Sequence, residues 1–147
     1  MSGAMYLLLV LAGQKVALPA DTVKSVVEID AVTPVPLVAP HVAGLFALRS
    51  RVLTVIDTRA SLALPGAGER RDQEAVIVSC DGHPYALLVD QVEDVVHAGP
   101  PEPAQALLQG GWRRASLGTV VCDGEARLLL DPAVLIAGPP PSAAAAA

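Results

Sequence analysis

Two aspartates occupy similar places in the two halves of this 147-residue chain and invite comparison with a catalytic pair. Asp57 and Asp131 each end an apolar segment, and paired carboxylates can act as general acid and general base. Such a pair needs side chains that converge from different environments, whereas these two precede short helical segments at equivalent positions. We therefore expect both to cap helix N-termini. Without a G-x-S-x-G motif or a phosphate-binding loop, the sequence predicts no enzyme.

Cysteine and histidine offer the other routes to reactivity. Cys80 and Cys122 could form one disulfide, but both lie in apolar segments typical of strands, so we expect two reduced thiols. His41, His83 and His97 lack the close spacing to one another or to a cysteine that a zinc site uses. We expect no catalytic residue, no metal site and no cofactor.

Charge and hydropathy limit the partners. The chain has 10 Lys and Arg against 15 Asp and Glu, a net charge of -5 that argues against nucleic acid as a partner. The longest apolar run, Met5–Ala12, is far shorter than the ~20 residues of a spanning helix, so we expect no direct membrane insertion. No Lys or Arg precedes Tyr6, which argues against a secretory signal. A cytoplasmic location is expected.

The local patterns favour β structure. Of the residues, 52% are hydrophobic but only 3% aromatic, so Leu, Val and Ala must form the core. Asp81-Gly82 and Asp123-Gly124 each lie between two apolar segments and predict tight hairpin turns. Short segments rich in Val and Leu, separated by Gly, Pro and Asp, predict strands at 6–12, 16–18, 52–56, 75–80, 85–89, 92–96, 117–122 and 128–130. Two-turn helices are expected at 57–64, 103–109 and 131–137.

The two halves of the chain resemble each other. Gly13–Val27 aligns without gaps on Gly82–Val96, with identical residues at seven of the fifteen positions, including Gly13/Gly82, Asp21/Asp90 and Val26/Val95. Two copies of one small β unit are therefore expected, joined by a linker at 67–73. We predict a mostly β fold of two pseudo-symmetric five-stranded antiparallel β-barrels packed together, with a few short helices.

The residues from Tyr6 to Ala137 resemble the CheW-like domain family, the coupling proteins of bacterial chemotaxis. The best marker of that family is a Gly, a short strand, Asn-Leu-Arg-Gly, and a strand that ends in Pro-Val-Ile-Asp-Leu-Arg. Here the segment from Gly44 to Arg59 reads GLFALRSRVLTVIDTR. It keeps Gly44, Leu48, Arg49, Asp57 and Arg59, whereas the family's Asn, Gly and Pro are replaced by Ala47, Ser50 and Thr54.

The resemblance implies one CheW-like domain at 1–137, with subdomains at about 13–66 and 74–130 and terminal segments that can cross between them, followed by a disordered Pro/Ala tail at 138–147. It implies a non-enzymatic adaptor that binds the cytoplasmic tip of chemoreceptors, in a groove between the barrels, and the regulatory domain of the histidine kinase CheA. The receptor-binding residues expected from it are Arg49, Gly44, Phe46, Val23 and Val76.

Each of these residues also has a structural alternative. The planar guanidinium of Arg49 can bind a partner's carboxylate, or brace its own loop by donating to Asp57 or to strand-end carbonyls. Gly44 can permit close backbone approach or occupy a plain turn. Phe46, Val23 and Val76 can be core residues. Two other functions stay open: a diverged scaffold for a non-chemotaxis kinase pathway, or a competitor of the main coupling protein. A small-ligand module using the cleft between the barrels is a further alternative.

Overall fold

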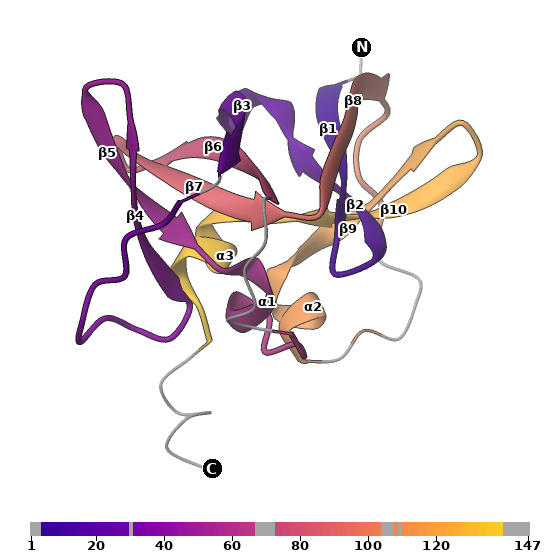
Figure 1. Cartoon of the computed structure of the whole chain (residues 1–147). Helices are drawn as coiled ribbons and strands as arrows, with labels where there is room; N and C mark the ends of the chain where they lie inside the picture. Colours follow the sequence, from indigo (N-terminus) through magenta and orange to yellow (C-terminus); the bar gives the residue numbers. More distant parts are fainter. Residues whose placement is uncertain (1–3, 30, 67–72, 104–107, 109, 140–147) are drawn as a thin grey trace.

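The computed structural model describes residues 4–29, 31–66, 73–103, 108 and 110–139. Within these ranges the fold is mostly β, as predicted, and consists of two five-stranded sheets with short helices between them (Figure 1). The segments 67–72 and 140–147, which include most of the expected linker and tail, lie outside the described residues.

The first sheet brings both ends of the chain together in the order β8-β1-β2-β10-β9. Its strands are β1 (Ala4–Leu11), β2 (Gln14–Pro19), β8 (Gln91–Ala98), β9 (Ser116–Cys122) and β10 (Glu125–Leu130). The second sheet, from the middle of the chain, has the order β3-β6-β7-β5-β4. Its strands are β3 (Val23–Ile29), β4 (Val42–Leu48), β5 (Arg51–Ile56), β6 (Gln73–Cys80) and β7 (His83–Val89).

The two sheet orders are equivalent, which agrees with the internal repeat. Read in order, β8, β1, β2, β10 and β9 of the first sheet correspond to β3, β6, β7, β5 and β4 of the second. Corresponding strands are always five strands apart in the chain. Each sheet nevertheless takes strands from both halves of the chain, so the sheets do not coincide with the segments 13–66 and 74–130. The chain crosses between them at the 3-10 turn η1 (Ala20–Thr22), after β2, and returns at Asp90, between β7 and β8.

The expectation of closed, purely antiparallel barrels was wrong in detail. β2 pairs with β10 in parallel, and β5 pairs with β7 in parallel. In the described part of the chain no ladder joins the edge strands β3 and β4, or β8 and β9; single bridges, Thr33 to Leu45 and Glu102 to Thr119, lie on the open sides instead. Prolines at 34, 36, 40, 100, 101 and 103 lack the amide donors that a further ladder would require.

The core has three apolar layers. A central cluster between the sheets includes Leu9, Leu18, Val76, Leu87 and Leu130. The opposite face of the second sheet encloses a cluster around Val55 and Ala86, and that of the first sheet one around Tyr6 and Leu129. Because side chains alternate across a strand, each sheet buries one set of aliphatic residues in its own core and the other set between the sheets. The central cluster is the shared apolar interface that the family resemblance implies.

The expected helix caps are confirmed. The helices are α1 (Thr58–Ser61), α2 (Gly110–Ala115) and α3 (Pro132–Ala137). The carboxylate of Asp57 accepts from the Ala60 amide at 3.2 Å, and that of Asp131 from the Ala133 amide at 3.0 Å. The helix expected at 103–109 falls mostly on residues that are not described, and the described helix in this region begins after it, at Gly110.

The predicted Asp-Gly turns are also present. Asp81 and Gly82 have φ of 52° and 79°, and Asp123 and Gly124 have 51° and 77°, values that suit two-residue hairpin turns. Both cysteines lie in strands as free thiols.

Asp90 joins the two sheets at the point where the chain returns to the first sheet. Its carboxylate accepts from the Gly13 amide of the β1–β2 turn at 2.9 Å and from the Arg59 guanidinium of α1 at 3.2 Å. Its repeat partner Asp21 is exposed, and no side-chain hydrogen bond is found for it among the described residues. The repeated aspartate therefore links the sheets in one copy only.

We predict that Asp90→Ala lowers the free energy of unfolding by about 1–2 kcal/mol, because it removes a carboxylate that accepts hydrogen bonds from Gly13 and Arg59. Asp21→Ala is the matched control and should change the free energy of unfolding by less than about 0.5 kcal/mol. Urea denaturation followed by circular dichroism measures both. Equal losses in the two variants would contradict the linking role of Asp90.

Candidate docking surfaces

Arg49 lies at the tip of the β4–β5 hairpin. It is the first residue of the turn, has φ of 58°, and its side chain is exposed. Within the described residues the guanidinium has no hydrogen bond or ion pair. Asp57, at the other end of β5, instead accepts from the amide of Ala60. The expected brace between Arg49 and Asp57 is therefore not found among the described residues, and the Arg49 side chain is exposed.

Gly44 and Phe46 lie on β4 of the same hairpin and are less accessible. Gly44 is buried with φ of 148°, and a Cβ atom there would lie 2.2 Å from the carbonyl oxygen of Thr33. It therefore permits the close approach that forms the Thr33–Leu45 bridge. Gly118 does the same in the first sheet, where a Cβ would lie 2.5 Å from the Glu102 carbonyl oxygen. Phe46 is half-buried and packs against the core of the second sheet.

Val23 and Val76 lie away from this hairpin. Val76, on β6, is 0% exposed and belongs to the central cluster, so it can influence a partner only through packing. Val23, at the start of β3, is half-buried and packs against the same cluster. The structure thus places Arg49, Gly44 and Phe46 on one hairpin, and Val23 and Val76 together near the opposite edge of the second sheet.

An exposed apolar surface lies where the two sheets meet, the region in which the family resemblance implies a groove, but its exposed residues were not among those predicted. β8 of the first sheet contacts β6 of the second, which pairs with β3. Val26 on β3 is 39% exposed, and its repeat partner Val95 on β8 is 45% exposed. Val26 pairs with Val76 and Val95 pairs with Leu7, and both of these partners belong to the central cluster. We call Val26, Val95 and the exposed Met5 of β1 the junction surface.

The identity of Val26 and Val95 in the repeat alignment is the signal that could have located this surface. Identical apolar residues in two edge strands indicate a pseudo-symmetric feature. Their exposure could not be inferred, because it depends on how the two sheets pack against each other.

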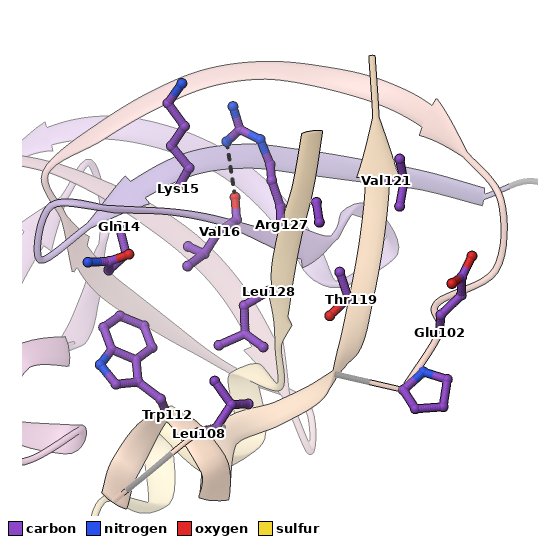
Figure 2. Close-up of a pocket in the computed structure, with 12 residues that line it drawn as sticks. Gln14, Lys15, Val16, Glu102, Leu108, Trp112, Thr119, Val121, Arg127 and Leu128 are labelled. Atoms are coloured by element: carbon purple, nitrogen blue, oxygen red, sulfur yellow. Dashed lines mark hydrogen bonds between the residues drawn. The ribbon is translucent and has the colours of Figure 1, made fainter. Parts of the chain in front are cut away.

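A separate pocket of about 630 Å³ lies on the outer face of β2, β9 and β10. Figure 2 shows the Trp112 ring beside Leu128, with Val16 above it and Leu108 below. At the upper rim, the buried Arg127 donates to the Val16 carbonyl oxygen at 3.4 Å and to Glu93 at 2.7 Å, while its Nε has no partner among the described residues. The pocket therefore has an apolar floor and a charged rim.

The described residues contain no group of three or more His, Cys, Asp or Glu side chains arranged to hold a metal ion. Among those same residues, no helix has the length and apolar character needed to cross a membrane.

Two equivalent sheets enclose a shared aliphatic interface, and the β4–β5 hairpin carries an exposed arginine. The model of the CheW-like domain family matches residues 5–139, and the chain belongs to this family.

Two relatives illustrate the match. The chain is 28% identical over 95 residues to the chemotaxis protein CheW of Bacillus subtilis, an alignment that spans 65% of this chain and 61% of that protein. Its fold is similar to the crystal structure of the scaffolding protein TtCheW from Thermoanaerobacter tengcongensis, with a TM-score of 0.75, 22% identity, and coverage of 89% of this chain and 90% of that one.

We predict that Gly44→Ala lowers the free energy of unfolding by about 3 kcal/mol or more, because a side chain at positive φ adds strain and the new methyl meets the Thr33 carbonyl. Gly13→Ala is the control, since Gly13 also has positive φ, at 77°, but no atom lies within 4 Å of the position that a Cβ would take there. That control should lose only about 1 kcal/mol. Chemical denaturation measures the free energy of unfolding of both variants. Equal losses would exclude a steric contact with Thr33 as the reason why position 44 is a glycine.

Proposed function

We propose that this chain is a non-enzymatic adaptor of bacterial chemotaxis that couples chemoreceptors, the methyl-accepting proteins, to the histidine kinase CheA. The observation that carries the proposal is the exposed Arg49, which has no partner among the described residues and lies in the motif that the family resemblance assigns to receptor binding. An arginine held at a hairpin tip presents a fixed fork of donors to a carboxylate or carbonyl of a partner.

The receptor contact needs an apolar component as well. The cytoplasmic tip of a chemoreceptor is a helical coiled coil, and an amphipathic helix binds through an apolar stripe. The junction surface offers short aliphatic side chains at 26 and 95 for such a stripe. Val23 and the buried Val76 support it from beneath, while Gly44 and Phe46 hold the hairpin that carries Arg49.

The kinase contact is expected through one end of the molecule. The family resemblance gives the regulatory domain of CheA the same fold as this chain, so one sheet of each can pack against the other. The adaptor works in the cytoplasm, where both the receptor tip and CheA lie.

Binding to each partner tests the proposal. The full chain should bind the CheA regulatory domain and a receptor tip fragment from the same genome, measured separately by isothermal titration calorimetry. Binding to neither would contradict the adaptor function.

We predict that Arg49→Ala weakens receptor-tip binding about tenfold, the cost of one charge-assisted hydrogen bond. The melting temperature should stay unchanged, because the guanidinium makes no hydrogen bond or ion pair with the described residues. Binding to the CheA regulatory domain is the internal control. A lowered melting temperature with unchanged receptor binding would instead assign Arg49 the bracing role.

We predict that Val26→Asp also weakens receptor-tip binding by at least tenfold, because it introduces a charge into an apolar contact. Val121→Asp, at another exposed strand position, is the matched control and should leave receptor binding unchanged. Both variants should fold, since both side chains are exposed. If the two variants bind the receptor tip equally well, the junction surface is not the receptor site.

A second candidate is a CheW-like scaffold for a non-chemotaxis kinase pathway, or a competitor of the main coupling protein. It is favoured by Ala47, Ser50 and Thr54, which replace family residues directly around Arg49. Restoring Asn, Gly and Pro at these positions distinguishes the two candidates. A strong gain in receptor affinity would indicate that the natural chain has diverged from that receptor.

A further inference from the structure

The edge strand β8, which carries one valine of the junction surface, contains a one-residue β-bulge. Along its pairing with β1, Val92 is opposite Leu9. The next pair is Asp94 with Leu8, so Glu93 is an extra residue without a partner in the ladder. An extra residue of this kind changes the direction in which the following side chains point.

The edge strand β3, which carries the other valine, contains an equivalent bulge. Val23 pairs with Val78 on β6 and Ser25 pairs with Ile77, which leaves Lys24 as the extra residue. Lys24 aligns with the extra residue of β8 in the internal repeat. Both copies of the repeat therefore have a bulge at the same position.

The two bulges explain why the junction surface is apolar. Side chains alternate across a strand, so residues three apart normally lie on opposite faces. Val92 and Val95 are three apart, yet both lie on the face of the first sheet that turns toward the central cluster, because the bulge lies between them. Val23 and Val26 share the corresponding face of the second sheet in the same way. Without a bulge, one residue of each pair would lie on the opposite face.

A buried arginine contacts the bulge of the first sheet. Arg127 on β10 is 6% exposed, and Figure 2 shows its side chain pointing away from Leu128, its neighbour on that strand. Its Nη1 donates to Glu93 at 2.7 Å and to the Val16 carbonyl oxygen at 3.4 Å. The guanidinium therefore joins β10, β2 and β8, and its shortest contact is with the extra residue itself.

The second sheet has no such ion pair among its described residues. β5 begins at Arg51 and β10 at Glu125, after equivalent turns. Arg127 therefore corresponds to Leu53, which is 2% exposed and belongs to the core of the second sheet. Lys24 is exposed and makes no hydrogen bond or ion pair with the described residues. A bulge at this position thus forms without an ion pair, and an apolar side chain fits the place of Arg127.

Stability does not account for the buried arginine. Taking a guanidinium out of water is costly, and replacing a buried ion pair by apolar residues is often neutral or stabilising. The Arg127 Nε also lacks a partner among the described residues. The best-attested benefit of a buried polar pair is the choice of one register among several. β8 offers such a choice, because Val95 and Val96 are adjacent and either could occupy an apolar position.

We propose that Arg127 is a positioning residue for the junction surface. Its guanidinium selects Glu93 as the extra residue of β8, and this choice places Val95 on the face to which the receptor tip is proposed to bind. The second sheet holds the same bulge from the other side, since the carboxylate of Glu74 accepts from the Val92 amide at 2.7 Å. The inference rests on the receptor binding proposed above.

Arg127→Leu tests the proposal, because leucine is the residue that the second sheet has at the equivalent position. The variant should fold with an unchanged or higher melting temperature. Its affinity for the receptor tip, measured by isothermal titration calorimetry, should fall about fivefold, a loss typical of residues that act on a site without touching it.

Two further variants separate the ion pair from other effects. Arg127→Lys keeps a cation beside Glu93 and should bind the receptor tip more tightly than Arg127→Leu. Lys15→Leu removes an exposed cation of the same sheet, which pairs with Glu125 and not with the bulge, and is the matched control. It should bind the receptor tip like the natural chain.

Hydrogen exchange followed by NMR tests the role of Arg127 without the receptor. In Arg127→Leu, the amides of β8 that bond to β1 should exchange with solvent at least about tenfold faster than in the natural chain, as expected for a strand that samples a second register. The amides of β3, whose bulge has no ion pair, should exchange at an unchanged rate. A general loss of stability would instead speed exchange in both strands alike.

Three results would overturn the proposal. Arg127→Leu could bind the receptor tip like the natural chain, Arg127→Lys could bind it as weakly as Arg127→Leu, or the β8 amides could exchange no faster in Arg127→Leu than in the natural chain. A natural chain that binds no receptor tip would contradict the proposed function itself, and hydrogen exchange would then still decide whether Arg127 fixes β8.

Discussion

The aliphatic cluster between the two sheets is the constraint on which the rest of the structure depends. Each sheet must bury one face in its own small core and the other face against the second sheet, so little polar surface remains inside. This packing explains a hydrophobic content of 52% with only 3% aromatic residues. Burial of this shared face also requires the chain to cross between sheets twice, at η1 and at Asp90. Those crossings bring β8 of the first sheet into contact with β6 of the second, beside β3, where the junction surface lies.

The pseudo-symmetry that follows from this packing gives features of one sheet a counterpart in the other, and some of these counterparts differ. Gly44 and Gly118 both have positive φ and both approach a backbone carbonyl closely, so they serve the fold. Asp90 and Asp21 are identical residues, but only Asp90 links the sheets. Arg49 and Asp123 are the first residues of the equivalent β4–β5 and β9–β10 turns; they differ in charge, and both are exposed. Equivalent positions of the two sheets therefore share a structural role at the two glycines but differ elsewhere, in their contacts or in their charge.

Much of the fold could be predicted because its signals are local. The Asp-Gly dipeptides require the positive φ values of tight turns, and Asp57 and Asp131 stand where a helix needs a cap. Two strands, β3 and β4, were not predicted from the residues. Three of the seven residues of β3 are polar, and β4 is interrupted by Gly44 and follows a Pro-rich loop. The pairing of β2 with β10 and of β5 with β7 is set by long-range packing, for which the sequence carries no local pattern.

The candidate site was harder to predict than the fold, because exposure is a property of the assembled sheets. A valine at position 26 and a valine at position 76 look alike in the sequence, yet the first is exposed and the second is in the core. We propose that separate surfaces of this chain hold a receptor and a kinase at the same time. Analytical ultracentrifugation of the chain mixed with a receptor tip fragment and the CheA regulatory domain tests it most directly. We predict a single ternary complex; two binary complexes that exclude each other would contradict the claim.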